Sequence, residues 1–201
     1  MHITVKARKG LPSFRSQRIH NMMLEVLRNQ IYVLRKYAGA FKVAHFSIQT
    51  NHIHIMIEAD DTKTLRSGVS GLVIAFARQL AKLLGRKKCK VWAERFHSRE
   101  LHAPRDVRNV LSYIFQSFKH HETTHGSGMR SRPHRYSSAR WFDGWYQQVL
   151  IPIPIDESAY MRGPPPWVPT TAGEPRTWLL GTGRKERHGK LNMMDRPGGV
   201  S

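Results

Sequence analysis

The chain has 201 residues, and its 33 basic against 14 acidic side chains give a formal net charge of +19. Because 40% of the residues are hydrophobic, we expect this charge on a folded domain with an appendage rather than on a disordered chain. Such an excess indicates a polyanionic partner, most simply nucleic acid, with an anionic membrane surface as the alternative. We find no membrane-spanning run and no secretory signal, and the single cysteine excludes an intrachain disulfide, so a cytoplasmic, nucleoid-associated protein without a membrane partner is expected.

The first half of the chain predicts three strands and one helix. Residues 2–8 alternate between apolar and polar side chains, as in a strand. After a break that contains glycine and proline, apolar residues at helical spacing run from Ile19 to Leu34 and predict a helix. Residues 41–50 predict a second strand, and a tight turn near Asn51 leads into a third strand over 52–59.

Two more helices and one more strand follow. A helix is expected over roughly 62–85, then a strand near 89–96 with a short extension to His102, and then a helix that opens at Pro104 and runs to about His121. The order strand, helix, strand, strand, helix, strand is typical of an α+β, ferredoxin-like fold, in which an antiparallel sheet carries two helices on one face. The third helix could then lie against the opposite face or beside it.

The character of the sequence changes after residue 124. Only two of the 11 prolines, Pro12 and Pro104, precede this point, and hydrophobic periodicity is lost beyond it. We therefore predict a folded domain over 1–124 and a Pro/Arg-rich, partly ordered extended tail over 125–201.

The strand over 52–59 carries a candidate metal site. Alternation places His52 and His54 on one face and the isoleucines between them on the other, with about 6.6 Å between the two histidine positions. Imidazoles at that spacing can converge on one divalent ion, whose shell a phosphate oxygen could complete. The alternative is an ordinary pair of histidines on an exposed strand face.

The helix that opens at Pro104 carries a tyrosine away from its apolar stripe. Tyr113 shares the polar side with Asn109 and Gln116, where a residue placed for packing would not be expected. A surface tyrosine with a hydrogen bond is the alternative at this position.

Together these features resemble the single-tyrosine HUH transposases, most of all the REP-associated tyrosine transposases. The resemblance rests on five stretches: R-K-G-L-P-S-F-R (8–15), H-F-S-I-Q-T-N-H-I-H-I-M-I-E-A (45–59), V-W-A-E-R-F-H-S-R-E-L (91–101), P-R-D-V-R-N-V-L-S-Y-I (104–114) and R-W-F-D-G-W (140–145). It implies that His52 and His54 bind a divalent metal, Mg or Mn, and that Tyr113 is the catalytic nucleophile.

One position departs from the family pattern. The fourth residue after the tyrosine is usually an amide that helps to complete the metal site, and here it is Ser117. Gln116, His120 or Glu58 could replace the amide as a metal ligand. The alternative is that activity is weakened or lost. A DNA-binding protein without cleavage therefore stays open as the alternative function.

The resemblance further implies a metal-dependent endonuclease and strand transferase that acts on single-stranded or hairpin DNA through a 5′-phosphotyrosine. It leaves open whether the protein is a monomer or a homodimer. Candidates for DNA contact are basic residues of the N-terminal segment and the third helix: Arg8, Lys9, Arg15, Arg105, Arg108 and Lys119.

A competing motif lies just after this helix. His121-Glu122-Thr123-Thr124-His125 matches H-E-x-x-H, the zinc metallopeptidase signature. That chemistry needs both histidines on a stable helix, whereas Gly126-Ser127-Gly128 follows at once. A peptidase is therefore a remote alternative.

Overall fold

The computed structural model describes residues 1–33, 40–87, 89–116, 136–142 and 177–192. Its centre is a four-stranded antiparallel sheet in the order β2-β3-β1-β4. The strands are β1 (His2–Lys6), β2 (Phe41–Ile48), β3 (His52–Ala59) and β4 (His97–Arg99). With the helices α1 (Gln17–Val33) and α2 (Thr62–Leu83), the element order is that of the ferredoxin-like fold, so the predicted fold class is confirmed.

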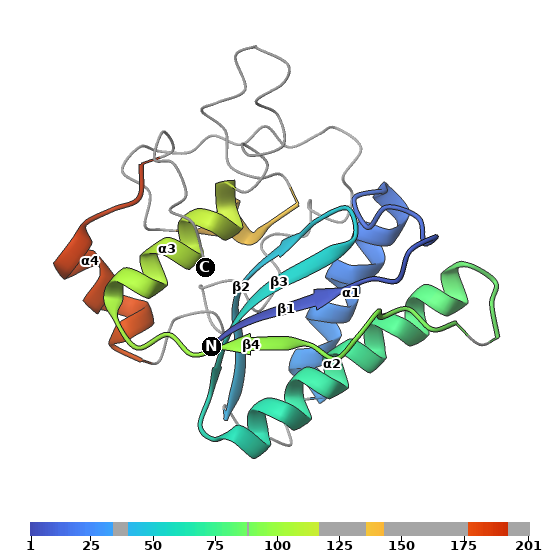
Figure 1. The fold of residues 1–201 in the computed structure, drawn as a ribbon, viewed down its shortest axis with the longest axis horizontal. Coiled ribbons are helices and arrows are strands. Elements are labelled where there is room, and N and C mark those ends of the chain that lie inside the picture. The colour runs from blue at the N-terminus through green and yellow to red at the C-terminus, as the bar shows by residue number, and fades with distance from the viewer. Residues whose placement is uncertain (34–39, 88, 117–135, 143–176, 193–201) are drawn as a thin grey trace, which may run out of the picture.

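The two long helices cover one face of the sheet (Figure 1). Alternate residues of β1 and β3, such as Val5 and Ile55, pack there against apolar residues of the helices, such as Leu24 and Leu72. Asp61 caps the start of α2, because its carboxylate accepts a hydrogen bond of 2.7 Å from the backbone N–H of Thr64. Because this core covers one face of the sheet, the side chains of β3 that point the other way lie on the opposite face.

The opposite face of the sheet carries α3 (Pro104–Gln116), as Figure 1 shows. Its buried residues Val107, Leu111 and Ile114 form a second core with Met56 of β3 and Leu101. Of the two placements left open by the sequence, the third helix therefore takes the one against the sheet. The predicted last turn of this helix, to His121, lies outside the described residues, as do Leu34 and the side chain of Ile31 at the end of α1.

The fourth strand is shorter than predicted and lies in the predicted extension toward His102. Residues 89–96 form only an isolated bridge, between Trp92 and Ala7, and the paired strand is His97–Arg99. Around Trp92 the backbone is bonded to the end of β1, since the N–H of Ala93 donates a hydrogen bond of 2.9 Å to the carbonyl of Lys6, while the indole of Trp92 donates one of 2.9 Å to the carbonyl of Val73 on α2. The first strand likewise ends at Lys6 rather than at residue 8.

Two short stretches of the C-terminal part pack onto the domain. Ser137 bridges to Ser47 of β2, next to the 3-10 turn η4 (Ser138–Trp141). The π-helical turn η5 (Leu179–Gly183) and α4 (Arg184–His188) lie against α3. The predicted division at residue 124 stays a prediction, because the surrounding residues lie outside the described part. None of the described helices has the length and hydropathy needed to cross a membrane.

Candidate active site

The two histidines of β3 lie on the face of the sheet that carries α3. Ile53, Ile55 and Ile57 point into the core under α1 and α2, so alternation directs His52 and His54 to the other side. The two imidazole rings are 4.7 Å apart between centroids. His54 is buried and His52 is half-buried, so that the pair runs from the interior toward the surface.

Tyr113 is brought to these histidines by α3. Asp106 accepts hydrogen bonds from the backbone N–H groups of His102 and Ala103, and Pro104 occupies the first turn, which fixes where the helix begins. The apolar side of α3 packs on the sheet, and the half-buried Tyr113 then stands edge-on to His54, with 5.0 Å between ring centroids. The structure thus brings together the three residues predicted to carry the chemistry.

Both histidines are held at Nδ1. The Nδ1 of His52 lies 2.8 Å from Oδ1 of Asn51, and because a carboxamide oxygen only accepts, Nδ1 carries the hydrogen. The Nδ1 of His54 lies 3.1 Å from the hydroxyl of Thr4 and 3.2 Å from Nε2 of His2. Groups that hold one ring nitrogen orient the other nitrogen toward a metal, as in many histidine sites.

His2 and Thr4 were missed by the sequence analysis. Alternation in residues 2–8 places them on one face, but the pairing of β1 with β3, which sets Thr4 opposite His54, cannot be read from a single strand. The same register sets the exposed Lys6 opposite His52, so a cation stands at the outer rim of the site.

His2 is buried beside the site and is neutral at physiological pH. Burial lowers the pKa of this imidazole to about 4, with smaller contributions from the N-terminal amine and Arg99. A neutral His2 can accept a hydrogen bond at Nε2, which the His54 tautomer with a hydrogen on Nδ1 can donate. That tautomer leaves the lone pair of His54 on Nε2.

The donor set fits a divalent metal with two protein nitrogen ligands. Two imidazoles held at Nδ1 suit a divalent first-row transition-metal ion, and oxygens of water or phosphate suit its remaining coordination positions. Within the described ranges, no group of three or more histidine, cysteine, aspartate or glutamate side chains could hold a metal.

The predicted additional ligands are placed as follows. Gln116 is buried, and its side-chain N–H donates a hydrogen bond of 3.0 Å to the carbonyl of Asn192. Glu58 accepts hydrogen bonds of 3.1 Å and 2.7 Å from the backbone N–H and hydroxyl of Thr177, about 13 Å along β3 from His54. Ser117 and His120 lie outside the described residues, and the choice among these ligands stays a prediction.

The described residues predicted to contact DNA lie in two parts of the fold, the segment after β1 and the helix α3. Arg8, Lys9 and Arg105 are exposed. The guanidinium of Arg15 lies 5.2 Å from the centre of the Tyr136 ring, and Arg108 donates hydrogen bonds to the carbonyls at the end of α4, the shortest of 2.8 Å to His188. Lys119 and the His121–His125 motif lie outside the described residues.

Comparison with known proteins agrees with the resemblance seen in the sequence. A family model described as "Transposase IS200 like" matches residues 10–117, more than half of the chain and the stretch that holds His52, His54 and Tyr113. The protein therefore belongs to the IS200-like transposase family.

A solved structure shares the fold. It is the structure of a REP-associated tyrosine transposase bound to a REP hairpin, with a TM-score of 0.51 and 19% sequence identity over 79% of this chain and 88% of that chain. At this identity the likeness concerns the fold alone. No curated protein matches the sequence.

Proposed function

We propose that this transposase is a metal-dependent single-strand DNA endonuclease and strand transferase whose nucleophile is Tyr113. The observation that carries the proposal is the contact of the Tyr113 and His54 rings, 5.0 Å apart, beside a second histidine. Membership of the IS200-like family supports the class of reaction, and the geometry supports the choice of residues.

The chemistry assigned to Tyr113 is an in-line attack on a phosphodiester. The phenol oxygen forms a bond to phosphorus, the bond from phosphorus to the 3′ oxygen breaks, and the phenol proton is exchanged for one on the departing 3′-hydroxyl. The product is a 5′-phosphotyrosine with a free 3′ end. Because one phosphodiester replaces another, a second 3′-hydroxyl can reverse the step, which is strand transfer.

His52 and His54 would hold the divalent ion, Mg or Mn, beside this phosphate. When bound, such an ion supplies Lewis-acid polarisation of a phosphoryl oxygen. The chain itself orients the two imidazoles through Asn51, Thr4 and His2 and keeps the phenol against His54. The exposed Lys6 at the rim adds positive charge where the DNA backbone would approach.

The proposed substrate is single-stranded or hairpin DNA. Support comes from the net charge of +19 and, by analogy, from the related fold that was solved with a REP hairpin. The cytoplasm, in association with the nucleoid, is the proposed place of action.

A covalent-adduct assay tests the proposal. The full chain is incubated with 5′- and 3′-labelled single-stranded hairpin DNA and Mn²⁺, and denaturing electrophoresis then separates free from protein-linked DNA. We expect an adduct with the fragment downstream of the cut, its loss in EDTA, and its loss in Tyr113→Phe, which retains the ring and removes only the nucleophilic oxygen. Tyr136→Phe is the matched control and should retain the adduct.

Two other results would favour the alternatives. DNA binding without an adduct would favour a DNA-binding protein that has lost cleavage, for which Ser117 at the usual amide position is the argument. Peptide cleavage that depends on Glu122 would favour the metallopeptidase.

A further inference from the structure

A pocket lined by cations lies at the end of β1. It has a volume of about 310 Å³ and lies between the segment after β1 and the segment after α2. Four of its seven lining residues, Arg8, Lys9, Arg86 and Lys90, are basic, against 33 of 201 in the whole chain. The pocket is therefore far more cationic than the composition of the protein explains.

The backbone around the pocket is fixed by several contacts. The N–H of Arg8 donates a hydrogen bond of 2.8 Å to the carbonyl of Val91, which ties the two segments together. At the end of α2, Gly85 takes a positive φ of 66°, and the N–H of Arg86 bonds to the carbonyl of Ala81. The backbone positions of the basic residues are therefore fixed by hydrogen bonds with the rest of the domain.

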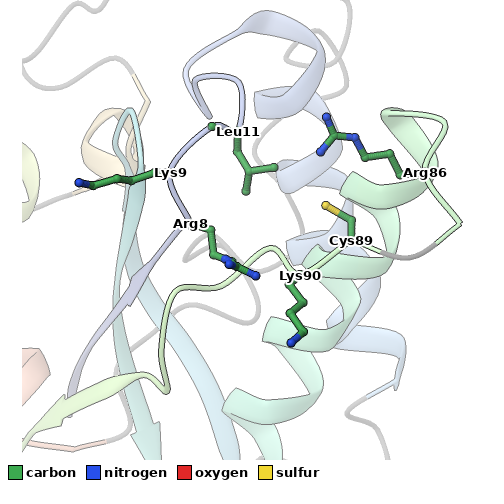
Figure 2. Close-up of a pocket in the computed structure, with 7 residues that line it drawn as sticks. Arg8, Lys9, Leu11, Arg86, Cys89 and Lys90 are labelled. Atoms are coloured by element: carbon green, nitrogen blue, oxygen red, sulfur yellow. The ribbon is translucent and has the colours of Figure 1, made fainter.

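The side chains meet around an open centre. Figure 2 shows the guanidinium of Arg86 and the thiol of Cys89 directed toward Arg8 and Leu11, while Lys9 and Lys90 extend outward. Gly10 has a φ of 84°, and a Cβ added there would meet nothing within 4 Å, so the entrance beside it is open. An anion held between Arg8 and Arg86 would have the two lysines at its periphery.

The charge of the pocket is not balanced by acidic groups. No lining residue is acidic, and among the described residues no carboxylate forms an ion pair with any of the four cations. Like charges brought together repel one another, so an anion that enters between Arg8 and Arg86 is stabilised by both, with a longer-range contribution from the two lysines. Guanidinium groups suit phosphate oxygens in particular, because their planar N–H groups can bond two oxygens at once.

The pocket is connected to the candidate active site along β1. Thr4 lies opposite His54 and Lys6 lies opposite His52, and Arg8 follows Lys6 by two residues, which span at most about 7 Å. We propose that the pocket binds a backbone phosphate of the DNA outside the scissile position, so that Lys6 and the pocket form a track leading away from Tyr113. The proposal rests on the proposed function insofar as the same DNA is cleaved.

The test measures binding separately from cleavage. Binding is measured in the Tyr113→Phe background, where no DNA is cut, across a range of salt concentrations. The pocket variant carries both Arg8→Gln and Arg86→Gln. The control variant carries both Lys63→Gln and Arg66→Gln, which removes the same charge from exposed positions near the start of α2, about 30 Å from Arg86. We expect the pocket variant to bind at least about tenfold more weakly and to lower the slope of log affinity against log salt by about two. The control pair should change the slope by much less.

Three probes distinguish which kind of phosphate the pocket binds. An unstructured single strand, a hairpin and inorganic phosphate are compared, and a loss confined to the hairpin would place the stem in the pocket. As a second readout, Cys89 is the only cysteine, so its rate of alkylation by a maleimide reports on the pocket directly. DNA should slow this rate, and the pocket substitutions should abolish the protection.

Equal affinity and salt slope for the pocket and control variants, with no protection of Cys89, would overturn the inference. The proposed function is judged separately, by the adduct formed at saturating DNA when Tyr113 is intact. If the pocket substitutions lower the salt slope of DNA binding but the protein with Tyr113 intact forms no adduct, the phosphate-binding pocket is supported and the proposed nuclease activity is contradicted.

Discussion

At the scale of single residues, the site depends on how His54 is held. Its Nδ1 lies near both the hydroxyl of Thr4 and the Nε2 of His2, and both partners come from β1. An imidazole restrained in this way presents Nε2 in a fixed direction, which lowers the entropic cost of metal binding. The N-terminal strand is thus part of the proposed metal site, although the family match begins only at residue 10.

Substitution of Thr4 tests this restraint. Thr4→Val retains the shape of the side chain and removes the hydroxyl, so we expect Mn²⁺ affinity to fall by about tenfold or more. Thr4→Ser retains the hydroxyl and should bind Mn²⁺ nearly as the wild type does. The measurement is Mn²⁺ titration by calorimetry or electron paramagnetic resonance, with DNA binding as the control. Equal Mn²⁺ affinity in Thr4→Val and Thr4→Ser would show that the hydroxyl does not orient His54.

His2 predicts how stability depends on pH. The fold lowers the pKa of His2 from 6.5 to about 4, so the folded state prefers the neutral imidazole. Its contribution is complete above pH 6.5 and is lost as the pH falls toward 4, because the unfolded chain then binds a proton that the folded chain does not. At about pH 4.5 this loss is roughly 2 kcal/mol.

The His2→Gln variant isolates that contribution. Glutamine cannot titrate, so its free energy of unfolding should fall less between pH 7 and about pH 4.5 than that of the wild type, by roughly 2 kcal/mol. Urea denaturation in EDTA at both pH values gives the four free energies needed. Parallel losses in the two proteins would mean that His2 is as easily protonated in the fold as in the unfolded chain.

The sequence predicted some of these residues and not others, for a physical reason. His52 and His54 share a strand, and Tyr113 lies on the polar side of one helix, so local periodicity singled them out and the family resemblance implied their roles. His2, Thr4 and Lys6 become relevant only through the register between β1 and β3. Arg86 and Lys90 meet Arg8 through the path of the segment after α2, which no periodicity encodes.

At the scale of elements, α2 packs closely on the sheet at one glycine. A Cβ built on Gly68 would lie 2.3 Å from the Phe41 ring of β2, whereas one built on Gly71, in the same helix, would meet nothing within 4 Å. The absence of a side chain at Gly68 therefore sets the distance between α2 and β2, while Gly71 has no such role.

The two glycines give a matched pair of substitutions. Gly71→Ala should raise the free energy of unfolding by up to about 1 kcal/mol, because alanine favours the helix. Gly68→Ala gains the same propensity but must displace the Phe41 ring, so we expect a net loss of about 1–2 kcal/mol. Thermal and urea unfolding measure both. Stabilisation by both substitutions would show that α2 moves away from Phe41 at little cost.

The elements themselves were predictable wherever one face of each was buried. The strands β2 and β3 and the helix α2 follow their apolar patterns closely. The main part of the fourth strand was predicted too early, because the apolar residues at 89–96 include Trp92, which contacts α2, whereas the three residues of β4 are all exposed and carry no apolar signal. An apolar residue that is buried against a helix cannot be told from one that is buried in a paired strand by sequence pattern alone.

At the scale of the whole molecule, the candidate site is assembled within one chain. Four residues, between Arg99 at the end of β4 and Pro104 at the start of α3, are enough to turn the chain back over the sheet. The apolar side of α3 then packs on Met56 of β3, and Tyr113 reaches His54 of the same chain. A homodimer in which two chains exchange the helix that carries the tyrosine would require this second core to open.

Mixing two inactive variants tests whether the site works within one chain. His54→Ala lacks a proposed metal ligand and Tyr113→Phe lacks the nucleophile, so neither should form a DNA adduct alone. If Tyr113 acts with the histidines of its own chain, an equimolar mixture should also remain inactive, even after joint unfolding and refolding to allow exchange of subunits. Exchange of the tyrosine helix between chains would instead restore up to about a quarter of wild-type adduct in the refolded mixture, since half of the dimers are mixed and each mixed dimer regains one of its two sites. That recovery would contradict assembly of the site from α3 and β3 of a single chain.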